Sequence, residues 1–162
     1  MGKILLERAE KTASAVIKQL APYCKKIAVA GSIRRRRPWV NDVDIVLVAA
    51  DPWQLHQAVL RLGQAKVAGS KIMRVMMGDT QVDIYFATED TWATLLLIRT
   101  GSAQHNIHLC SLAKEKGMKL HADGSGLFAL DDFGVERRVA GDTEASIFAA
   151  LGLPYKRPEE RE

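Results

Sequence analysis

The sequence lacks the features that mark secreted, membrane-spanning or zinc-stabilised proteins. Only 2 of its 162 residues are cysteine, Cys24 and Cys110, and they lie far apart with no C-x-x-C spacing. This usage argues against a disulfide framework or a structural zinc site, and it makes a reducing cytoplasm the expected compartment. No apolar run approaches the roughly 18 residues that span a bilayer, and the start has no secretory signal pattern, so we expect no membrane partner.

The composition is that of a folded, mildly basic protein. Hydrophobic residues make up 48% of the chain, which supplies a buried core and argues against intrinsic disorder. The formal net charge of +4 permits a polyanionic partner without requiring one. A length of 162 residues suits one ordinary domain, or a small domain with an appended subdomain.

The first half of the chain has the hydrophobic pattern of a small mixed sheet with helices on one face, which is an α+β fold. The pattern predicts these elements because apolar residues recur at helical or strand spacing between turn residues. The expected elements are a helix over the first twenty residues, strands over 26–30 and 43–49, a helix capped by Asp51, and an antiparallel hairpin of 71–77 with 81–86.

The second half has a different texture, with helices first and short strands after them. We place a boundary near Glu89, which gives one domain over residues 1–89 and a smaller helical and β subdomain over residues 90–162. The expected elements are helices over 90–99, 103–116 and 142–151, and short strands over 118–121 and 126–129.

Three aspartates in the first half form the most informative pattern. Asp42 and Asp44 are two residues apart at the start of an apolar strand, so their carboxylates point to the same side. Such a pair is unfavourable unless a cation lies between the charges, and Mg²⁺ prefers carboxylate oxygens. Asp83 lies in the second hairpin strand, and beside the first strand it would complete a two-metal site for phosphoryl chemistry. Taken alone, an Asp-x-Asp pair is more often a turn at a strand start.

A glycine, a serine and four arginines precede these aspartates. Gly31 and Ser32 follow a strand and begin a short helix, where backbone N–H groups can approach a phosphate. Arg35 comes about one helical turn later and can reach the same anion with its planar guanidinium. The run at residues 34–37 is otherwise a solvated cluster or a general nucleic-acid patch, and we expect only one or two of its members to bind phosphate.

Four motifs resemble those of the family X DNA polymerases, within the polymerase beta-like nucleotidyltransferase superfamily. They are GSIRRRRPWVNDVDIVLV for the G-S-x-R-R…D-x-D motif, TQVDIYF for the third-aspartate strand, LIRTGSAQHNIHL for the T-G-S…N motif, and ALGLPYKRPEERE for the closing segment. The motifs occur in the family's order and spacing, and the similarity covers essentially the whole chain. The resemblance implies a catalytic palm over residues 1–89 and a nucleotide-binding subdomain over residues 90–162.

In the first half, the resemblance implies roles for the residues already singled out. Asp42 and Asp44 match the two aspartates that bind both metal ions, and Asp83 matches the third, which binds the catalytic metal near the primer 3′-hydroxyl. Ser32 and Arg35 match residues that contact the β- and γ-phosphates of the incoming nucleotide. Gly31 belongs to the same loop.

In the second half, the resemblance assigns the nucleotide's sugar and base. Gly101 matches the glycine of the T-G-S turn beside the sugar, and Asn106 matches the asparagine at the minor-groove edge of the base. From the residues alone, Asn106 has a second reading, in which it caps or solvates the start of its helix. Ser102 is the better candidate for that cap.

The implied function is template-directed addition of a nucleotide to a primer 3′-hydroxyl, in short-gap DNA repair synthesis. The implied cofactor is a pair of Mg²⁺ ions, with Mn²⁺ as the alternative ion. The implied partners are primer–template or gapped DNA and a nucleoside triphosphate, and we expect a monomer. Two alternatives stay open: a nucleotidyltransferase with an RNA, small-molecule or protein acceptor, and a DNA-binding module without catalysis.

Departures from the family pattern carry expectations of their own. Ile98 and Arg99 replace two aromatic residues that help to exclude a ribose 2′-hydroxyl, so we expect tolerance of ribonucleotides. Gln81 replaces an arginine, common in animal members, that lies two residues before the third aspartate. We expect the protein to lack the family's usual amino-terminal lyase region and helix-hairpin-helix element, because only about 27 residues precede the first expected strand. We therefore expect a minimal form whose affinity for DNA is weak and strongly salt-dependent.

A few remaining residues have only weak signals. His105 and His108 lack a third zinc ligand at suitable spacing, and His105 is instead a candidate to line a nucleotide or DNA cleft. Trp39 is expected either to stack on a base or to pack in the protein. We expect Cys24 and Cys110 to be small core residues.

Overall fold

The structure is a computed structural model that describes residues 2–162. The chain forms two compact units, Met1–Thr88 and Glu89–Glu162, and each is described here by itself. The elements of the first unit are β1 (Ile4–Leu5), α1 (Leu6–Leu20), η1 (Ala21–Tyr23), β2 (Cys24–Val29), α2 (Gly31–Arg34), β3 (Trp39–Val40), β4 (Val43–Ala49), α3 (Pro52–Leu60), β5 (Gln64–Ala68), β6 (Ile72–Met77) and β7 (Thr80–Ala87).

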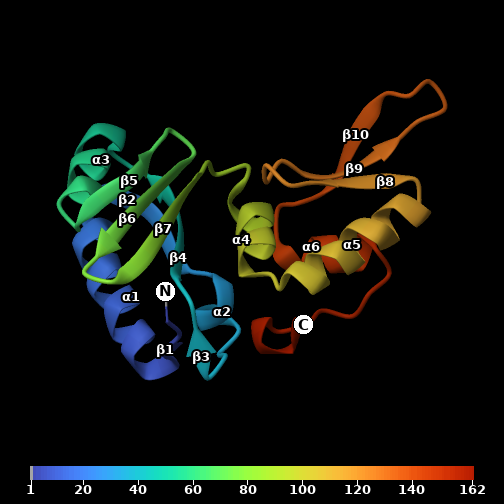
Figure 1. Cartoon of the computed structure of the whole chain (residues 1–162). Coiled ribbons are helices and arrows are strands. Elements are labelled where there is room, and N and C mark those ends of the chain that lie inside the picture. The colour runs from blue at the N-terminus through green and yellow to red at the C-terminus, as the bar shows by residue number, and fades with distance from the viewer. Residues whose placement is uncertain (1) are drawn as a thin grey trace. The chain divides into compact units, whose positions relative to one another are not determined.

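A mixed five-stranded sheet forms the centre of the first unit (Figure 1). Its strand order is β2-β4-β7-β6-β5, in which β4 and β7 run parallel and the other neighbours are antiparallel. The short strands β1 and β3 pair with each other outside this sheet. The predicted α+β fold with a mixed sheet is therefore confirmed.

Helices α1 and α3 pack on one face of this sheet (Figure 1). Alternate strand residues face these helices, because successive side chains of a strand point to opposite sides. Val43, Ile45 and Leu47 of β4 and Val82 and Ile84 of β7 are fully buried in this core. The residues between them, which include Asp44 and Asp83, therefore lie on the opposite face.

The sequence signals for α3 act as expected. The Asp51 carboxylate accepts a hydrogen bond from the backbone N–H of Gln54 at 3.0 Å, and Pro52 occupies the first helical position. The helix expected over the first twenty residues begins only at Leu6, so that expectation is wrong at its start. Ile4 and Leu5 instead pair with Val40 and Trp39, which holds the entry to α1 in extended form.

The second unit consists of helices around a three-stranded antiparallel sheet of order β10-β9-β8. A separate apolar core, which includes Leu97, Leu109, Leu127 and Phe148, lies between its elements. No helix within residues 2–162 has the length and apolar character needed to cross a membrane. The elements are α4 (Trp92–Thr100), α5 (Ala103–Glu115), β8 (Met118–His121), β9 (Gly126–Leu130), β10 (Glu136–Ala140), α6 (Glu144–Ala150) and η2 (Pro158–Glu160).

A buried arginine fixes the closing segment to this second core. Arg161 is fully buried, and its Nη1 donates to Glu144 Oε2 at 2.7 Å while its Nε donates to the Lys156 carbonyl at 3.0 Å. Its guanidinium also lies 5.3 Å from the centre of the Phe148 ring. A buried charge is tolerated only with such partners. The ion pair of Arg161 with Glu144 therefore holds the closing segment against the start of α6.

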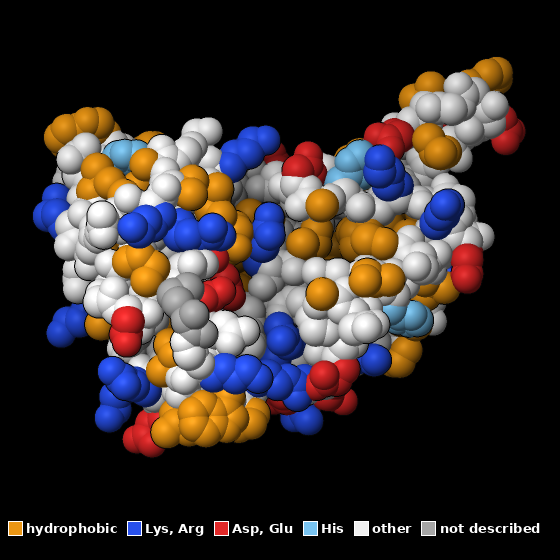
Figure 2. All heavy atoms as spheres, viewed as in Figure 1, with side chains coloured by type: hydrophobic (Ala, Val, Ile, Leu, Met, Phe, Trp, Pro, Cys, Tyr) orange, Lys and Arg blue, Asp and Glu red, His pale blue; other side chains and the backbone are white. Residues whose placement is uncertain are grey.

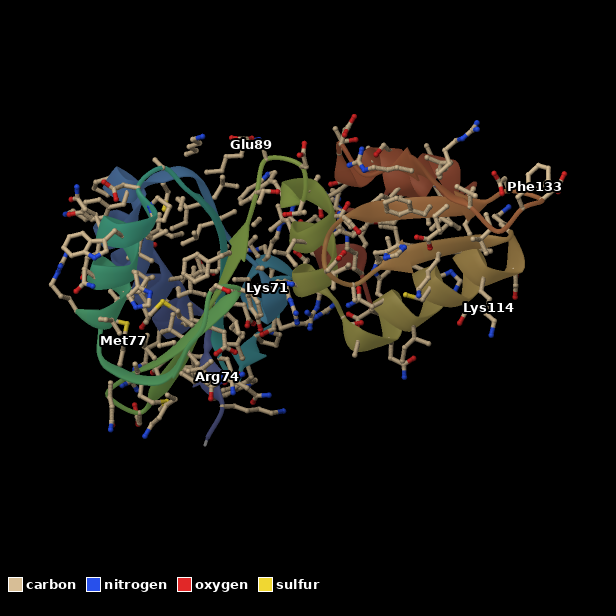
Figure 3. All side chains as sticks on the ribbon, turned by 90° about the horizontal axis from the view of Figure 1, so that it is seen from above. Lys71, Arg74, Met77, Glu89, Lys114 and Phe133 are labelled. Carbon is tan, nitrogen blue, oxygen red and sulfur yellow. The ribbon has the colours of Figure 1, made fainter. Side chains whose placement is uncertain are left out.

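The hairpin of β9 and β10 projects from the rest of its unit and exposes apolar side chains at its tip (Figure 2). Asp131 closes the turn, because its Oδ1 accepts from the backbone N–H groups of Phe133 and Val135 at 2.9 and 2.8 Å. The Phe133 side chain, labelled in Figure 3, is 91% exposed. The hairpin turn is therefore fixed by hydrogen bonds from its backbone to the Asp131 side chain, and not by packing of Phe133.

Candidate active site

Strands β4 and β7 bring together carboxylates that are distant in the sequence. Asp44 and Asp83 are direct partners in the register of the parallel pair. Asp42 precedes Asp44 by two residues. The negative charge of Asp83 acts on the Asp42 carboxylate, so the two carboxylates are close enough to repel each other. Three carboxylates therefore gather on the sheet face that α1 and α3 leave uncovered.

Burial makes this cluster electrostatically costly. Asp83 is only 3% exposed, and Asp42 and Asp44 are half-buried. Burial raises the pKa of Asp42, and the negative charge of Asp83 raises it further, while the nearby Arg74 guanidinium lowers it. A cation bound among these carboxylates would relieve both the burial and the repulsion.

Replacing Asp42 by asparagine is expected to stabilise the metal-free protein at pH 7. The raised pKa means that ionised Asp42 is less favourable in the folded chain than in the unfolded one. The gain fades as the pH falls through the folded pKa, because the wild-type carboxyl is then protonated as well. Solvent screening keeps the gain below about 1 kcal/mol.

Urea unfolding of the Asp42→Asn protein in a chelator, in steps from pH 7 to pH 3, measures this gain. The matched control is Asp79→Asn, because Asp79 is an exposed carboxylate in the turn between β6 and β7. A variant that is less stable than wild type at pH 7 would show that Asp42 is not under electrostatic strain.

Arg74 of β6 is the charged partner of Asp83 (Figure 3). The two residues are direct partners in the antiparallel pair of β6 and β7, and Arg74 Nε donates to Asp83 Oδ1 at 2.8 Å. This hydrogen bond and the charge of Asp83 raise the pKa of Arg74. The Gln81 amide donates to both oxygens of Asp83, at 3.3 Å to Oδ1 and 3.2 Å to Oδ2.

Reasoning from the sequence alone missed Arg74. The feature that could have identified Arg74 is the turn that joins β6 to β7. In this turn Gly78 has φ of +65° and Met77 pairs with Thr80. A two-residue turn at this point places Arg74 opposite Asp83 by counting back along both strands. The turn had been expected over three residues, 78–80, and that expectation leaves the register open.

The loop at Gly31 lies directly against the carboxylate of Asp44. Gly31 has φ of +60°, and a Cβ atom at this position would collide with the Asp44 carboxylate. The backbone N–H of Ala30 donates to the Asp44 carbonyl at 2.8 Å, which fixes the loop on β4. Glycine is required here both for the conformation and for the space.

Ser32 lies in the short helix α2 and Arg35 is the C-cap of that helix, and both are half-buried. Burial lowers the pKa of Arg35, as does the charge of Arg37, while the charge of Asp44 raises it. Arg35 therefore lies in the electrostatic environment of Asp44. Arg36 differs from it, because its Nη1 is 3.7 Å from the Glu10 carboxylate of α1. The run of arginines is thus divided between different partners.

In the second unit, Gly101 and Asn106 lie in and just after the turn between α4 and α5. Gly101 has φ of +71°, and the Ser102 hydroxyl accepts from the backbone N–H of His105 at 3.2 Å, as an N-cap does. Asn106 Nδ2 donates to the Ile98 carbonyl at 2.9 Å. Within residues 2–162, its Oδ1 is buried and has no hydrogen-bond partner. Asn106 is therefore neither the helix cap nor a solvated side chain.

Two minor expectations about single residues are wrong. His105 is only 2% exposed and packs with its ring centre 5.7 Å from that of Phe148, so it belongs to the second core and does not line a cleft. Cys110 is exposed, because it lies on the outer side of α5. Cys24 is half-buried, and burial raises its pKa to about 11. Trp39 is 53% exposed, so about half of it is covered by the protein and half is open to solvent.

The donor set of the carboxylate cluster fits a hard divalent cation. Mg²⁺ and Mn²⁺ bind carboxylate oxygens, and Asp42, Asp44 and Asp83 supply them on one face. Within residues 2–162, no three acidic, histidine or cysteine side chains already have the arrangement of a metal site. The oxygen ligands are thus of the kind that the ion prefers. The positive charge that the protein itself places beside Asp83 is the guanidinium of Arg74.

Comparisons with known proteins agree on one family. A family model described as DNA polymerase beta thumb matches residues 95–162. DNA polymerase/3′-5′ exonuclease PolX of Bacillus subtilis (strain 168) is 31% identical over 148 residues, which is 85% of this chain. DNA polymerase lambda of Rattus norvegicus is 36% identical over 87 residues, which is 51% of this chain.

The fold has a close counterpart among solved structures. The crystal structure of Leishmania infantum polymerase beta, in a ternary P/T complex, superposes with a TM-score of 0.80 and 23% identity. The match covers 99% of this chain and 77% of that one. The two units therefore have a polymerase beta-like α+β fold. The sequence similarities show that the chain belongs to family X of the DNA polymerases.

The similarity covers a limited part of the longer relatives. The chain spans 24% of the Bacillus subtilis protein and 15% of the rat protein.

Proposed function

We propose that the chain transfers a nucleotide from a nucleoside triphosphate to the 3′-hydroxyl of a DNA primer, in short-gap-filling synthesis. One observation carries the proposal. Parallel β4 and β7 place Asp44 beside Asp83, and Asp42 shares their face of the sheet. Two-metal phosphoryl transfer requires carboxylates gathered at one place, and here one is buried and two are half-buried.

In this proposal, some side chains of the first unit bind the metal ions and others bind the phosphates of the nucleotide. Asp42 and Asp44 hold the cations that the triphosphate binds, and Asp83 lies at the entering oxygen. Divalent cations at such a site stabilise the attacking and leaving oxygens and ease deprotonation of the primer hydroxyl. Ser32 and Arg35 donate hydrogen bonds to the β- and γ-phosphates, and Gly31 lets the loop backbone approach them.

The second unit supplies the contacts to the nucleoside. In this proposal, residues 90–162 bind the nucleotide and residues 1–89 form the palm. Gly101 lies beside the sugar, and Asn106 lies at the edge of the base, where its Nδ2 keeps a second N–H beyond the one bound to the Ile98 carbonyl. The bond from Asn106 to the Ile98 carbonyl holds the amide in place before the nucleotide arrives.

DNA is the acceptor that the family favours. The two similar proteins are DNA polymerases, and the chain's net charge of +4 is compatible with a polyanionic partner. The exposed Trp39 follows the arginine run and offers a stacking surface near the phosphate loop.

Primer extension by the full chain tests the proposed function. We expect Mg²⁺-dependent extension of a primer across a one-nucleotide gap, weaker extension of an open primer–template, and no extension of an unpaired primer. A chelator should abolish it, and Mn²⁺ should restore it. Parallel reactions with ribonucleotides are expected to proceed within about tenfold of the deoxyribonucleotide rate, because Ile98 and Arg99 lack aromatic bulk.

The same assay separates the alternatives. DNA binding without turnover in either ion would favour a non-catalytic DNA-binding module. Extension of an RNA primer but not of a DNA primer would show that the acceptor is RNA. Incubation with a triphosphate but no primer reports transfer to the protein itself or to a small molecule.

A further inference from the structure

We propose that Arg74 is a positioning residue for Asp83, and that its guanidinium holds this carboxylate so that Oδ2 is left for a divalent cation. The inference rests on the proposed function in one respect, namely that Asp83 is a metal ligand. It goes beyond that function because Arg74 lies on β6, outside all of the motifs that the resemblance covers.

The strand register gives Arg74 a fixed approach to Asp83. The two residues are opposite each other in the antiparallel pair, so both side chains leave the sheet on the same face. Arg74 Nε donates to Oδ1 at 2.8 Å, a short distance typical of a charge-assisted hydrogen bond. The strand pairing fixes the backbones of Arg74 and Asp83 opposite each other. The Arg74 side chain can therefore leave Asp83 only if the sheet opens or if its own rotamer changes.

The hydrogen bonds to Asp83 are unequal at its two oxygens. Oδ1 accepts from Arg74 at 2.8 Å and from Gln81 at 3.3 Å, whereas among residues 2–162 Oδ2 accepts only from Gln81, at 3.2 Å. A carboxylate held at one oxygen keeps a defined orientation and leaves lone pairs on the other oxygen. In metal sites, partners of this kind orient the ligand and tune its affinity for the ion.

Burial explains why Asp83 requires a charged partner. The Asp83 side chain is 5% exposed and that of Arg74 is 38% exposed, so the pair extends from the sheet to solvent. A carboxylate this buried is unfavourable without a compensating charge. Gln81 is neutral and contributes hydrogen bonds only, so Arg74 provides the compensating charge within the sheet.

The contacts of Gln81 provide a sharp test by exchange of the two side chains. Gln81 already reaches both oxygens of Asp83 from the same strand, so an arginine at this position would reach the same carboxylate. The double variant Arg74→Gln with Gln81→Arg has the same composition and net charge as the wild type. It moves the guanidinium from β6 to β7 and changes nothing else in the chain.

The experiment measures Mn²⁺ binding to the full chain by electron paramagnetic resonance of the free ion, without DNA or nucleotide. We expect Arg74→Gln to weaken Mn²⁺ binding at least about tenfold. The exchange variant should recover to within about threefold of the wild type. The control is Arg61→Gln, which removes one exposed positive charge from the end of α3 and should bind Mn²⁺ as the wild type does.

Each outcome decides the assignment. Unchanged or tighter Mn²⁺ binding by Arg74→Gln would overturn it, since Arg74 would then be a bystander or a competitor of the ion. An exchange variant as weak as Arg74→Gln would also overturn it. If Arg74→Gln does not fold, a folded exchange variant with wild-type affinity supports the proposal, and one without that affinity refutes it.

The readout also keeps this proposal apart from the proposed function. A wild-type chain that takes up no Mn²⁺ at millimolar concentration would refute both. A wild-type chain that binds Mn²⁺ but extends no primer would refute the polymerase function alone and leave the role of Arg74 toward Asp83 intact.

Discussion

Replacing Asp44 by asparagine is expected to lower Mg²⁺-dependent primer extension by about 10³-fold or more, with the chain still folded. Asparagine keeps the shape that packs against Gly31, and β4 is otherwise apolar. The change removes one negative charge from the cluster of Asp42, Asp44 and Asp83. The remaining carboxylates bind a divalent cation less tightly, because carboxylates bind such ions better than amides do.

Single-turnover extension of a gapped duplex at saturating nucleotide measures this loss. Asp79→Asn is again the matched control, since it removes a carboxylate from the exposed turn of the same hairpin. Circular dichroism and urea unfolding establish that both variants keep the fold. An Asp44→Asn protein with more than a tenth of the wild-type rate would remove Asp44 from the proposed metal site.

Replacing Gly31 by alanine is expected to affect both stability and activity. The new Cβ would occupy the space of the Asp44 carboxylate, and φ of +60° is strained for any residue with a side chain. The strain alone costs about 1 to 3 kcal/mol. The collision must in addition move Asp44 or the loop, and we expect primer extension to fall about 10²-fold, as a displacement of about 1 Å in a catalytic group can cause.

Gly78→Ala is the control that separates strain from collision. Gly78 has φ of +65°, but nothing lies within 4 Å of a Cβ built there. We expect it to lose stability by a similar strain and to keep wild-type activity. Equal activity losses for the two alanine variants would mean that contact between Gly31 and Asp44 does not matter for the reaction.

The elements with strong local signals could be predicted from the sequence. Strand β4 has the bounds expected for it, Val43–Ala49, because an apolar run of this length between polar turns has few other structures available. The cap at Asp51 and the hairpin around Gly78 follow from side chains that act within a few residues. Asp42 and Asp44 could be predicted for the same reason, since they lie in one short motif.

Elements without a local signal could not be predicted. Strand β5, Gln64–Ala68, was missed because all of its residues are exposed and Val67 is its only large apolar residue, so no strongly apolar run marks it. Strand β10, Glu136–Ala140, reads as a charged loop, and β1 and β3 have two residues each, too few to show a period. These strands form through pairing with a partner elsewhere in the chain, which a local pattern does not record.

The same limit applies to side chains whose role depends on register or on which helix face is covered. The pairing of Arg74 with Asp83 exists only once the turn at Gly78 fixes which residues are opposite. His105 was expected at a cleft and is buried against Phe148, because the sequence does not say which side of α5 meets the second core.

The parallel pairing of β4 and β7 has a consequence for how the first unit folds. A parallel pair cannot form through a tight turn, so the chain must pass through α3, β5 and β6 before Asp44 meets Asp83. Contacts of this sequence separation are slow to form and depend on the rest of the sheet. A bound cation would exist only in the completed sheet, and its binding energy would stabilise that state by mass action. Metal supply would thereby set how much of the chain is folded, as well as how fast it reacts.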